Sequence, residues 1–169
     1  FNRRFNIDVK VKHEVVGIDV NNKRVKVLDL NNNKEFYEAY DKLVLSCGAK
    51  TIKPHFYDEN YNMFTLRTVE DTYKIKEIIN TNKVSTATII GGGFIGVEMA
   101  ENLKNLGIDV SIVQSNKQLL RILDKDMVSF VHSEMRKNGV KLYLNKKVIS
   151  VTKTSDKLSI TLSDDTKIE

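Results

Sequence analysis

Glycines at fixed spacing form the part of this sequence with the clearest chemical meaning. Gly91, Gly93 and Gly96 follow the pattern G-x-G-x-x-G directly after the apolar run at 88–90. The first glycine permits a turn that a Cβ would obstruct, the second lets a backbone approach a pyrophosphate, and the third lets a helix pack close to its strand. Unpaired N–H groups at the start of that helix favour phosphate. Because strand, turn and helix patterns occur in the required order, the stretch predicts a dinucleotide-binding site.

Polar residues after the next strand pattern bear on which dinucleotide is bound. A dinucleotide-binding unit usually carries an acidic residue about 20 positions after the turn, where it hydrogen-bonds the ribose hydroxyls. Gln114 stands there in this sequence, and glutamine bonds a ribose hydroxyl without repelling a 2′-phosphate. Lys117 and Arg121 lie near enough in sequence to meet such a phosphate, although plain surface charge explains them equally well. The pattern therefore permits NADPH and does not exclude NADH.

Phe94 and Glu98 are candidates for contact with the nicotinamide end of the ligand. Phe94 follows the second motif glycine and faces either the ligand or the protein core. Glu98 lies in the first turns of the helix, where a carboxylate either contacts the nicotinamide ribose and carboxamide or caps the helix through its dipole. The sequence leaves both pairs of alternatives open.

Hydrophobic periodicity predicts the elements that position these residues. Residues 86–144 alternate as β-α-β-α-β, with Gly107 expected to end the first helix in a left-handed conformation and Asp124 expected to cap the second. The expected elements are strands at 87–90, 108–113 and 140–144, helices at 94–106 and 124–137, and strands of an antiparallel excursion at 147–153 and 157–162.

The first 50 residues carry short alternating patterns that predict an antiparallel meander. The expected strands are 7–11, 15–19, 24–28 and 35–39, separated by asparagine-rich turns. The apolar run Lys42–Ser46 predicts a buried strand that delivers the small-residue turn after it to something placed close by. Residues 50–62 contain the only proline and predict a linker, after which Thr68 is expected to cap an amphipathic helix over 69–79.

Bulk composition excludes several classes of protein. The length of 169 residues suits one domain, or one domain plus part of another. The composition, with 41% hydrophobic and 29% charged residues, is ordinary for a folded chain. Its formal net charge of +5 comes from dispersed lysines, which favours a solvated surface over a nucleic-acid partner. The single cysteine cannot form an internal disulfide, which favours a reducing, cytoplasmic compartment. No apolar stretch approaches the ~20 residues that span a bilayer, so no membrane partner is expected.

Longer segments resemble the flavin-dependent pyridine nucleotide–disulfide oxidoreductases. The resemblance is greatest to the branch of coenzyme A disulfide reductase, NADH oxidase, NADH peroxidase and persulfide reductase. It covers essentially the whole chain and rests on residues 44–54, 64–72, 90–103 and 119–127.

The resemblance implies an α/β fold of two parts. Residues 1–50 would be the last part of an FAD-binding domain, mainly its β-meander. Residues 51–169 would be a three-layer, Rossmann-like NAD(P)H-binding domain with a parallel sheet and an antiparallel excursion. Because the family begins with an FAD-binding unit and a redox cysteine, and because the chain starts at Phe1, the chain is expected to be an internal fragment whose redox cysteine lies upstream.

The resemblance also implies roles for individual residues. Phe94 matches an aromatic gate over the flavin, and Glu98 matches a carboxylate beside the nicotinamide. The stretch 87–102 is implied to hold NAD(P)H, through Gly91, Gly92, Gly93, Phe94, Ile95, Gly96 and Glu98. Gln114, which departs from the family pattern, and Lys117 and Arg121 complete the expected NAD(P)H contacts, because they follow the second strand of the dinucleotide-binding unit. Those implied to contact FAD are Val15, Ser46, Cys47, Gly48 and Arg67. Cys47 stands where the family usually has proline or threonine, and we expect it to be a small buried residue beside the flavin rather than a redox thiol.

The implied activity is hydride transfer from NAD(P)H to FAD, with electrons passing on to a small-molecule disulfide or persulfide such as coenzyme A disulfide. The intact protein is expected to be a homodimer, and this part alone is expected to be inactive. One alternative is an NADH oxidase or peroxidase that reduces oxygen or peroxide, and another is a non-catalytic dinucleotide-sensing module. The three histidines match no metal-ligand spacing, so no metal site is expected.

Overall fold

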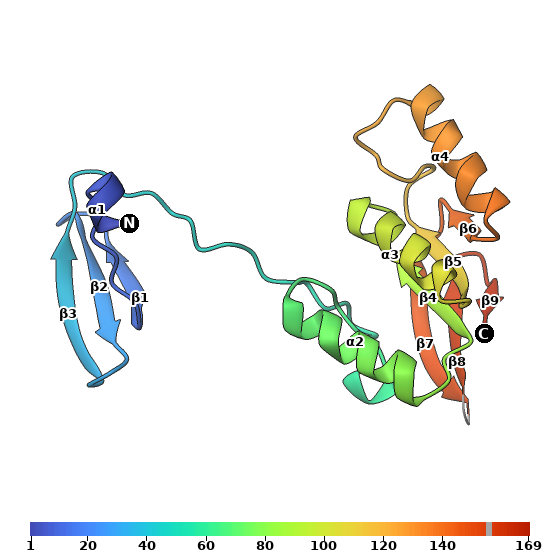
Figure 1. Ribbon diagram of the computed structural model, residues 1–169, viewed down its shortest axis with the longest axis horizontal. Helices are drawn as coiled ribbons and strands as arrows, with labels where there is room; N and C mark the ends of the chain where they lie inside the picture. Colours follow the sequence, from blue (N-terminus) through green and yellow to red (C-terminus); the bar gives the residue numbers. More distant parts are fainter. Residues whose placement is uncertain (155–156) are drawn as a thin grey trace. The chain divides into compact units, whose positions relative to one another are not determined.

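The computed structural model describes residues 1–154 and 157–169 and divides into two compact units (Figure 1). The first unit is Phe1–Ala49 and the second is Lys50–Glu169.

The first unit is a three-stranded antiparallel meander in the order β1-β2-β3. It confirms the strands expected at 15–19, 24–28 and 35–39. Asp19 stabilises the first turn by accepting hydrogen bonds from the backbone and side chain of Asn22. Its elements are α1 (Asn2–Phe5), β1 (His13–Asp19), β2 (Arg24–Asp29) and β3 (Lys34–Ala39).

Two strands expected in this unit are absent from the described residues. Residues 7–11 and Lys42–Ser46 both have irregular backbone. The second segment was expected to be buried, yet Val44 and Leu45 are 85% and 67% exposed. A strand requires a neighbour that pairs its N–H and C=O groups and covers its apolar side chains. Neither segment has such a neighbour in the described chain, so alternation and apolarity were insufficient signals.

The second unit contains a parallel sheet in the order β4-β5-β6 and an antiparallel sheet in the order β7-β8-β9. This agrees with the predicted parallel sheet and antiparallel excursion, and adds the short β9. The strands are β4 (Thr86–Ile90), β5 (Asp109–Gln114), β6 (Lys141–Leu144), β7 (Val148–Thr154), β8 (Lys157–Leu162) and β9 (Lys167–Ile168). The helices are η1 (Glu59–Tyr61), α2 (Val69–Thr81), α3 (Phe94–Asn105) and α4 (Lys125–Lys137).

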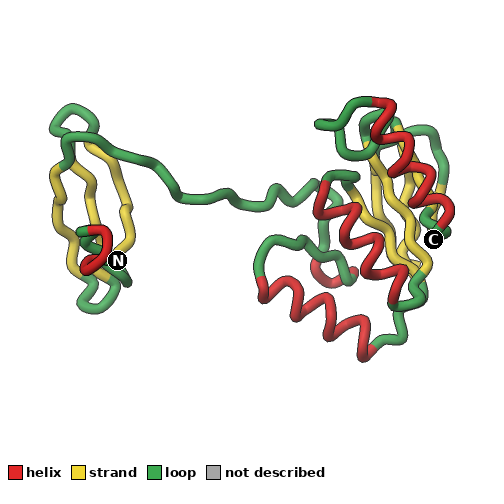
Figure 2. Tube along the Cα trace, turned by 45° about the horizontal axis from the view of Figure 1, so that its top comes forward, coloured by secondary structure: helices red, strands yellow, loops and turns green. Residues whose placement is uncertain are grey.

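Strand β5 is the centre of the core because it is buried on both faces. Val110 and Ile112 pack in one cluster with Leu103 of α3 and Val128 of α4. The alternate residue Val113 packs in a second cluster with β7, β8 and β9. The parallel sheet therefore lies between a helical layer and the antiparallel sheet, which gives the three layers expected (Figure 2).

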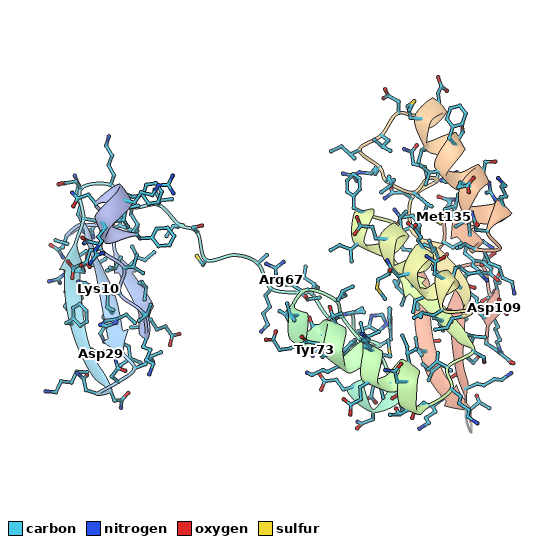
Figure 3. The ribbon with its side chains drawn as sticks, in the orientation of Figure 1. Lys10, Asp29, Arg67, Tyr73, Asp109 and Met135 are labelled. Carbon is cyan, nitrogen blue, oxygen red and sulfur yellow. The ribbon has the colours of Figure 1, made fainter. Side chains whose placement is uncertain are left out.

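Helix ends follow local chemistry. Thr68 and Asp71 form a reciprocal capping box at the start of α2, and the backbone N–H groups of Thr68 and Arg67 hold the pKa of Asp71 below its ordinary value. Arg67 lies immediately before Thr68, the N-cap of this helix (Figure 3). Gly107 has a φ of +80° after α3, as expected for a left-handed helix end. Asp124 occupies the N-cap position of α4, although its side chain accepts no capping hydrogen bond.

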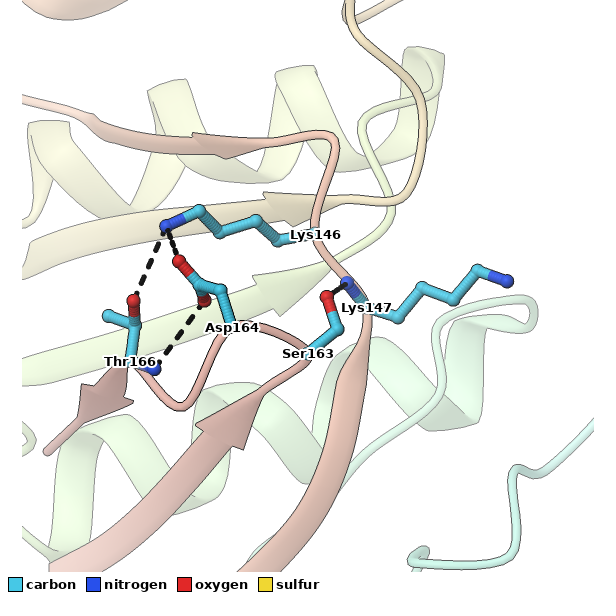
Figure 4. Close-up of polar contacts among 5 residues, drawn as sticks. All are labelled: Lys146, Lys147, Ser163, Asp164 and Thr166. Carbon is cyan, nitrogen blue, oxygen red and sulfur yellow. Dashed lines mark hydrogen bonds and ion pairs between the residues drawn. The ribbon is translucent and has the colours of Figure 1, made fainter.

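A polar clamp joins the entry of β7 to the turn between β8 and β9 (Figure 4). Lys146 Nζ donates to Asp164 Oδ2 and, at 3.3 Å, to Thr166 Oγ1. The backbone N–H of Lys147 donates to Ser163 Oγ at 3.2 Å. Lys146 lowers the pKa of Asp164, so the clamp contains a charged pair. It ties the connection between β6 and β7 to the turn between β8 and β9.

Candidate dinucleotide-binding site

The glycine-rich turn leaves the carboxyl end of β4 and enters α3. Gly91 has a φ of +110°, a conformation that favours glycine over any residue with a Cβ. Its N–H donates to the carbonyl of Val113 at 2.9 Å, which ties the turn to β5. The turn is therefore placed at the carboxyl edge of the parallel sheet, where open α/β sheets bind their ligands.

Gly96 is required by the protein itself. A Cβ at this position would lie 2.0 Å from the carbonyl oxygen of Gly91, a backbone atom that cannot move aside. Gly96 is buried in the first turns of α3. The glycine lets the helix approach the turn closely, which is the role that the motif predicted for it.

Gly93 has no such internal requirement. Its φ of −80° is an ordinary conformation, and a Cβ there would meet no atom within 4 Å. Gly93 is also the N-cap of α3, it has no side chain that could cap the helix, and no acidic residue lies in the first turn. The open space and the uncapped N–H groups fit a phosphate group that approaches the backbone.

Gly92 is covered by the segment that follows β5. A Cβ on Gly92 would lie 2.2 Å from Leu119 Cδ2, and the N–H of Leu120 donates to the carbonyl of Gly92 at 2.7 Å. Leu119 is fully buried, and Leu120 has a φ of +44°. The segment after β5 is thus attached directly to the glycine turn.

His132 of α4 fastens the same segment from the other side. Its Nε2 accepts a hydrogen bond from the N–H of Leu119 at 3.1 Å, so the ring is neutral. Burial lowers the pKa of His132, and the nearby Arg136 lowers it further. No role for His132 was expected from the sequence, because hydrophobic periodicity does not predict a hydrogen bond between positions 119 and 132.

Gln114 ends β5 beside the turn. Its Oε1 accepts from the N–H of Gly92 at 3.4 Å, and its Nε2 donates to the carbonyl of Gln118 at 3.4 Å. The side chain therefore connects the glycine turn to the following segment. It places a neutral amide where many related sites have a carboxylate.

Lys117 and Arg121 both line a cavity of about 520 Å³ next to the end of β5. The wall also contains Lys125 and Asp124 from the start of α4. The complete lining is Ser115, Asn116, Lys117, Gln118, Arg121, Leu123, Asp124, Lys125 and Asn145. The two predicted cations thus lie around one concave surface rather than scattered over the protein.

Phe94 and Glu98 lie one helical turn apart on α3, and both are exposed. Phe94 is 59% exposed and its neighbour Ile95 is 58% exposed, so neither is part of the core of this unit. Glu98 lies beyond the first turn of α3, which contains no acidic residue, so its capping alternative is wrong. The aromatic ring and the carboxylate remain free to meet a ligand.

The candidate FAD contacts Val15, Ser46, Cys47 and Gly48 belong to the first unit. Val15 is 55% exposed on β1, and Gly48 has a φ of +73° in the irregular segment after β3. Cys47 was expected to be buried, but it is exposed because no described residue packs over that segment. Arg67 is exposed in the second unit, and its N–H donates to Asp71. These assignments remain predictions.

The described residues contain no group of three or more His, Cys, Asp and Glu side chains placed to hold a metal ion. None of the helices in residues 1–154 and 157–169 is both long and apolar enough to span a bilayer.

Comparison with known proteins gives results consistent with a dinucleotide-binding oxidoreductase. Residues 2–169 match the family model described as pyridine nucleotide-disulphide oxidoreductase. Coenzyme A disulfide reductase of Staphylococcus haemolyticus is 34% identical over 151 residues, which cover 89% of this chain and 34% of that protein. The chain thus spans about a third of the length of the curated relatives it matches.

Solved structures have the same arrangement of elements. Reduced Bacillus anthracis CoADR-RHD has a TM-score of 0.81 and 38% identity, over 99% of this chain and 30% of that one. A NAD-dependent persulfide reductase from A. fulgidus has a TM-score of 0.79 and 30% identity, over 99% of this chain and 31% of that one. Because it has the glycine turn, the three layers and a family match over nearly every residue, the chain belongs to the pyridine nucleotide-disulphide oxidoreductase family, which depends on FAD and NAD(P)H.

Proposed function

We propose that this chain provides the NAD(P)H-binding surface, and part of the FAD-binding surface, of an enzyme that reduces a small-molecule disulfide or persulfide. Coenzyme A disulfide is the substrate that the similarity to coenzyme A disulfide reductases favours. The proposal assigns residues 1–50 to the FAD-binding domain and residues 51–169 to the NAD(P)H-binding domain. The observation that carries it is the open backbone at Gly93, beside uncapped N–H groups of α3.

The residues of the second unit would act by binding and orientation. Gly91, Gly92 and Gly93 would hold the pyrophosphate through backbone N–H groups and the helix dipole. Gln114 would meet the adenosine ribose. Exposed Phe94 and Glu98 would lie against the nicotinamide, where the ring excludes water and the carboxylate fixes the carboxamide or ribose. Lys117 and Arg121 would bind the anionic end of the ligand.

Four residues of the first unit would contact FAD: Val15, Ser46, Cys47 and Gly48. Arg67 of the second unit would contact FAD as well. Cys47 would have no redox role. FAD, when bound, supplies the acceptor for hydride from NAD(P)H. We further propose a cytoplasmic homodimer for the intact protein. The single cysteine fits a reducing compartment, and size-exclusion chromatography with light scattering tests the dimer.

The central test is anaerobic mixing of the intact, flavin-loaded protein with NADPH or NADH. We expect loss of oxidised-flavin absorbance, followed by release of thiol when coenzyme A disulfide is added. Oxygen consumption without disulfide reduction would instead identify an oxidase. A protein that purifies without flavin would identify a dinucleotide-sensing module and overturn the proposal.

A substitution pair tests the nicotinamide contact. We expect Phe94→Ala to alter the change in flavin fluorescence on addition of NAD(P)H. Phe130→Ala on α4 is the control, because Phe130 is also exposed, at 71%, and lies outside the proposed contact. An unchanged response in Phe94→Ala would remove Phe94 from the site.

A further inference from the structure

The three histidines of the chain make hydrogen bonds of opposite kinds. His13 Nδ1 and His55 Nε2 lie 2.8 Å and 3.2 Å from backbone carbonyl oxygens. A carbonyl oxygen only accepts, so these two rings donate, and a protonated ring can donate equally well. His132 Nε2 instead accepts from the backbone N–H of Leu119. Protonation therefore breaks the bond of His132 and leaves those of His13 and His55 in place.

The bond from Leu119 to His132 helps to hold a strained piece of backbone. The φ of +44° at Leu120 is a left-handed conformation that a leucine rarely adopts. Such a conformation persists only where the surrounding contacts determine it. Here the N–H of Leu119 is held by His132, and the N–H of Leu120 is held by the carbonyl of Gly92. Without the acceptor on His132, the N–H of a fully buried residue loses its partner, and the strain at Leu120 then favours rearrangement.

Leu119 and Leu120 also determine where the glycine turn lies. Leu119 Cδ2 fills the space beside Gly92, where an added Cβ would lie 2.2 Å from it. The next residue, Gly93, is the N-cap of α3, where the uncapped N–H groups are proposed to bind phosphate. Backbone groups bind a ligand more tightly when they are held in place in advance. The position of the turn therefore depends on Leu119 and Leu120, and their position depends on His132.

The surroundings of His132 favour its neutral form at neutral pH. Burial lowers the pKa of His132, and Arg136, one turn further along α4, lowers it further. No hydrogen bond joins the ring to any other titratable side chain of the described part of α4 or of the described elements that pack with it. Those side chains are Lys125, Asp126, Glu134 and Lys137 of α4, Glu98, Glu101 and Lys104 of α3, Lys117 and Arg121 of the segment after β5, and Lys141 and Tyr143 of β6.

We propose that His132 is a positioning residue for nucleotide binding: its neutral ring holds Leu119 and Leu120 against Gly92, and its protonation weakens the binding of the nucleotide. The inference rests on the proposed function, because it requires the glycine turn to bind the nucleotide. His132 contacts neither nucleotide nor flavin and acts through the backbone of Leu119. Nucleotide affinity is then highest where the ring is neutral and falls as pH falls through the range in which the ring gains its proton.

Calorimetry with NAD⁺ on the intact, flavin-loaded protein tests the inference without hydride transfer. NAD⁺ lacks the 2′-phosphate, whose own titration overlaps that of an imidazole. We expect the Kd of the wild type to rise at least about fivefold between pH 7.5 and pH 5, a change that the loss of one buried hydrogen bond is large enough to produce. His132→Gln should bind as tightly as the wild type at pH 7.5 and show a much flatter profile, because its amide oxygen accepts from Leu119 and does not titrate.

A second pair of variants tests the acceptor itself. His132→Leu removes the acceptor, so at pH 7.5 it should bind NAD⁺ about as weakly as the wild type does at pH 5. Hydrogen exchange in the peptide 115–123 should also be faster. His55→Leu is the matched control, since it removes an exposed imidazole of the same unit that bonds the carbonyl of Ile149, and it should change neither readout. The wild type and His132→Gln decide the question even where His132→Leu does not fold.

The two proposals fail in different ways. Parallel pH profiles for the wild type and His132→Gln would overturn the positioning role, although NAD⁺ binding would still support the nucleotide site. Faster hydrogen exchange in His132→Leu with unchanged affinity would also overturn it, because the segment would then be held by His132 without shaping the turn. Absence of NAD⁺ binding to the wild type at millimolar concentration and both pH values would overturn the proposed function and the inference together.

Discussion

The two units of this chain differ in how much apolar surface they bury among their own residues. In Phe1–Ala49, Val25 and Val27 are the buried hydrophobic residues. In Lys50–Glu169, two clusters cover both faces of β5. Folding costs conformational entropy, which burial of apolar surface must offset. A three-stranded meander with one thin layer buries too little apolar surface to do so, in contrast to three packed layers.

The difference extends to the candidate sites. In the second unit the shape of the glycine turn follows from contacts within the unit, such as those from Gly96 to Gly91 and from Leu120 to Gly92. In the first unit, Val15 and Cys47 are exposed, and no described contact shapes a site around them. The geometry of the glycine turn can therefore be described from contacts within its own unit. The geometry of the candidate FAD contacts cannot be described in this way.

Separating the units should have the largest effect. We expect residues 50–169 alone to unfold in a single cooperative transition on heating, because both core clusters are retained. Residues 1–49 alone should show no cooperative transition in circular dichroism. A sharp transition in the smaller piece would show that the meander is self-sufficient and would remove the contrast.

One isoleucine substitution in each unit compares the stability contributions of the two units within the intact chain. Ile112 is fully buried in β5, and Ile18 is 44% exposed in β1. We expect Ile112→Ala to lower the free energy of unfolding by about 4 kcal/mol and Ile18→Ala to change it by less than about 1 kcal/mol. Urea denaturation measures both, and similar losses would mean that Ile18 is covered in solution.

Two glycines in one turn should respond in opposite ways to the same added methyl group. Gly96→Ala forces a Cβ against a carbonyl oxygen, so we expect a loss of about 3 kcal/mol in unfolding free energy. Gly93→Ala meets no protein atom, so stability should change by less than about 0.5 kcal/mol.

Nucleotide binding gives the second readout for this pair. Gly93→Ala should weaken NADPH binding by at least about tenfold, since the Cβ would occupy space needed by the pyrophosphate. Unchanged affinity in a folded Gly93→Ala protein would contradict the proposed phosphate contact.

Acid should produce the smallest effect, and it should come through His132. The folded-state pKa of this ring is lowered, so its contribution to stability is present above the ordinary imidazole pKa of about 6.5 and is lost as pH falls through the folded value. Protonation removes the acceptor that holds the N–H of Leu119. Thermal melts from pH 7.5 to pH 5 should show a decline that His132→Gln reduces, because glutamine offers an acceptor that does not titrate.

Local chemistry made much of the second unit predictable. The order of strands and helices, the capping residue Thr68, the helix end at Gly107 and the glycine turn each depend on short stretches of sequence. The contacts of Leu119 with Gly92 and His132 join residues far apart in the chain, and no periodicity encodes them. The strand expected at Lys42–Ser46 failed for a related reason, since an apolar run specifies a tendency to be covered but not what covers it.

The contact between Gly92 and Leu119 has a consequence for how this chain tolerates mutation. The motif G-x-G-x-x-G leaves its second position variable, yet here a side chain at 92 would occupy the space of Leu119 Cδ2. A larger residue at 92 therefore requires either a shift of the buried Leu119 side chain or a smaller residue at 119. The two positions, 27 residues apart in the printed sequence, should vary together among related chains that keep this loop conformation.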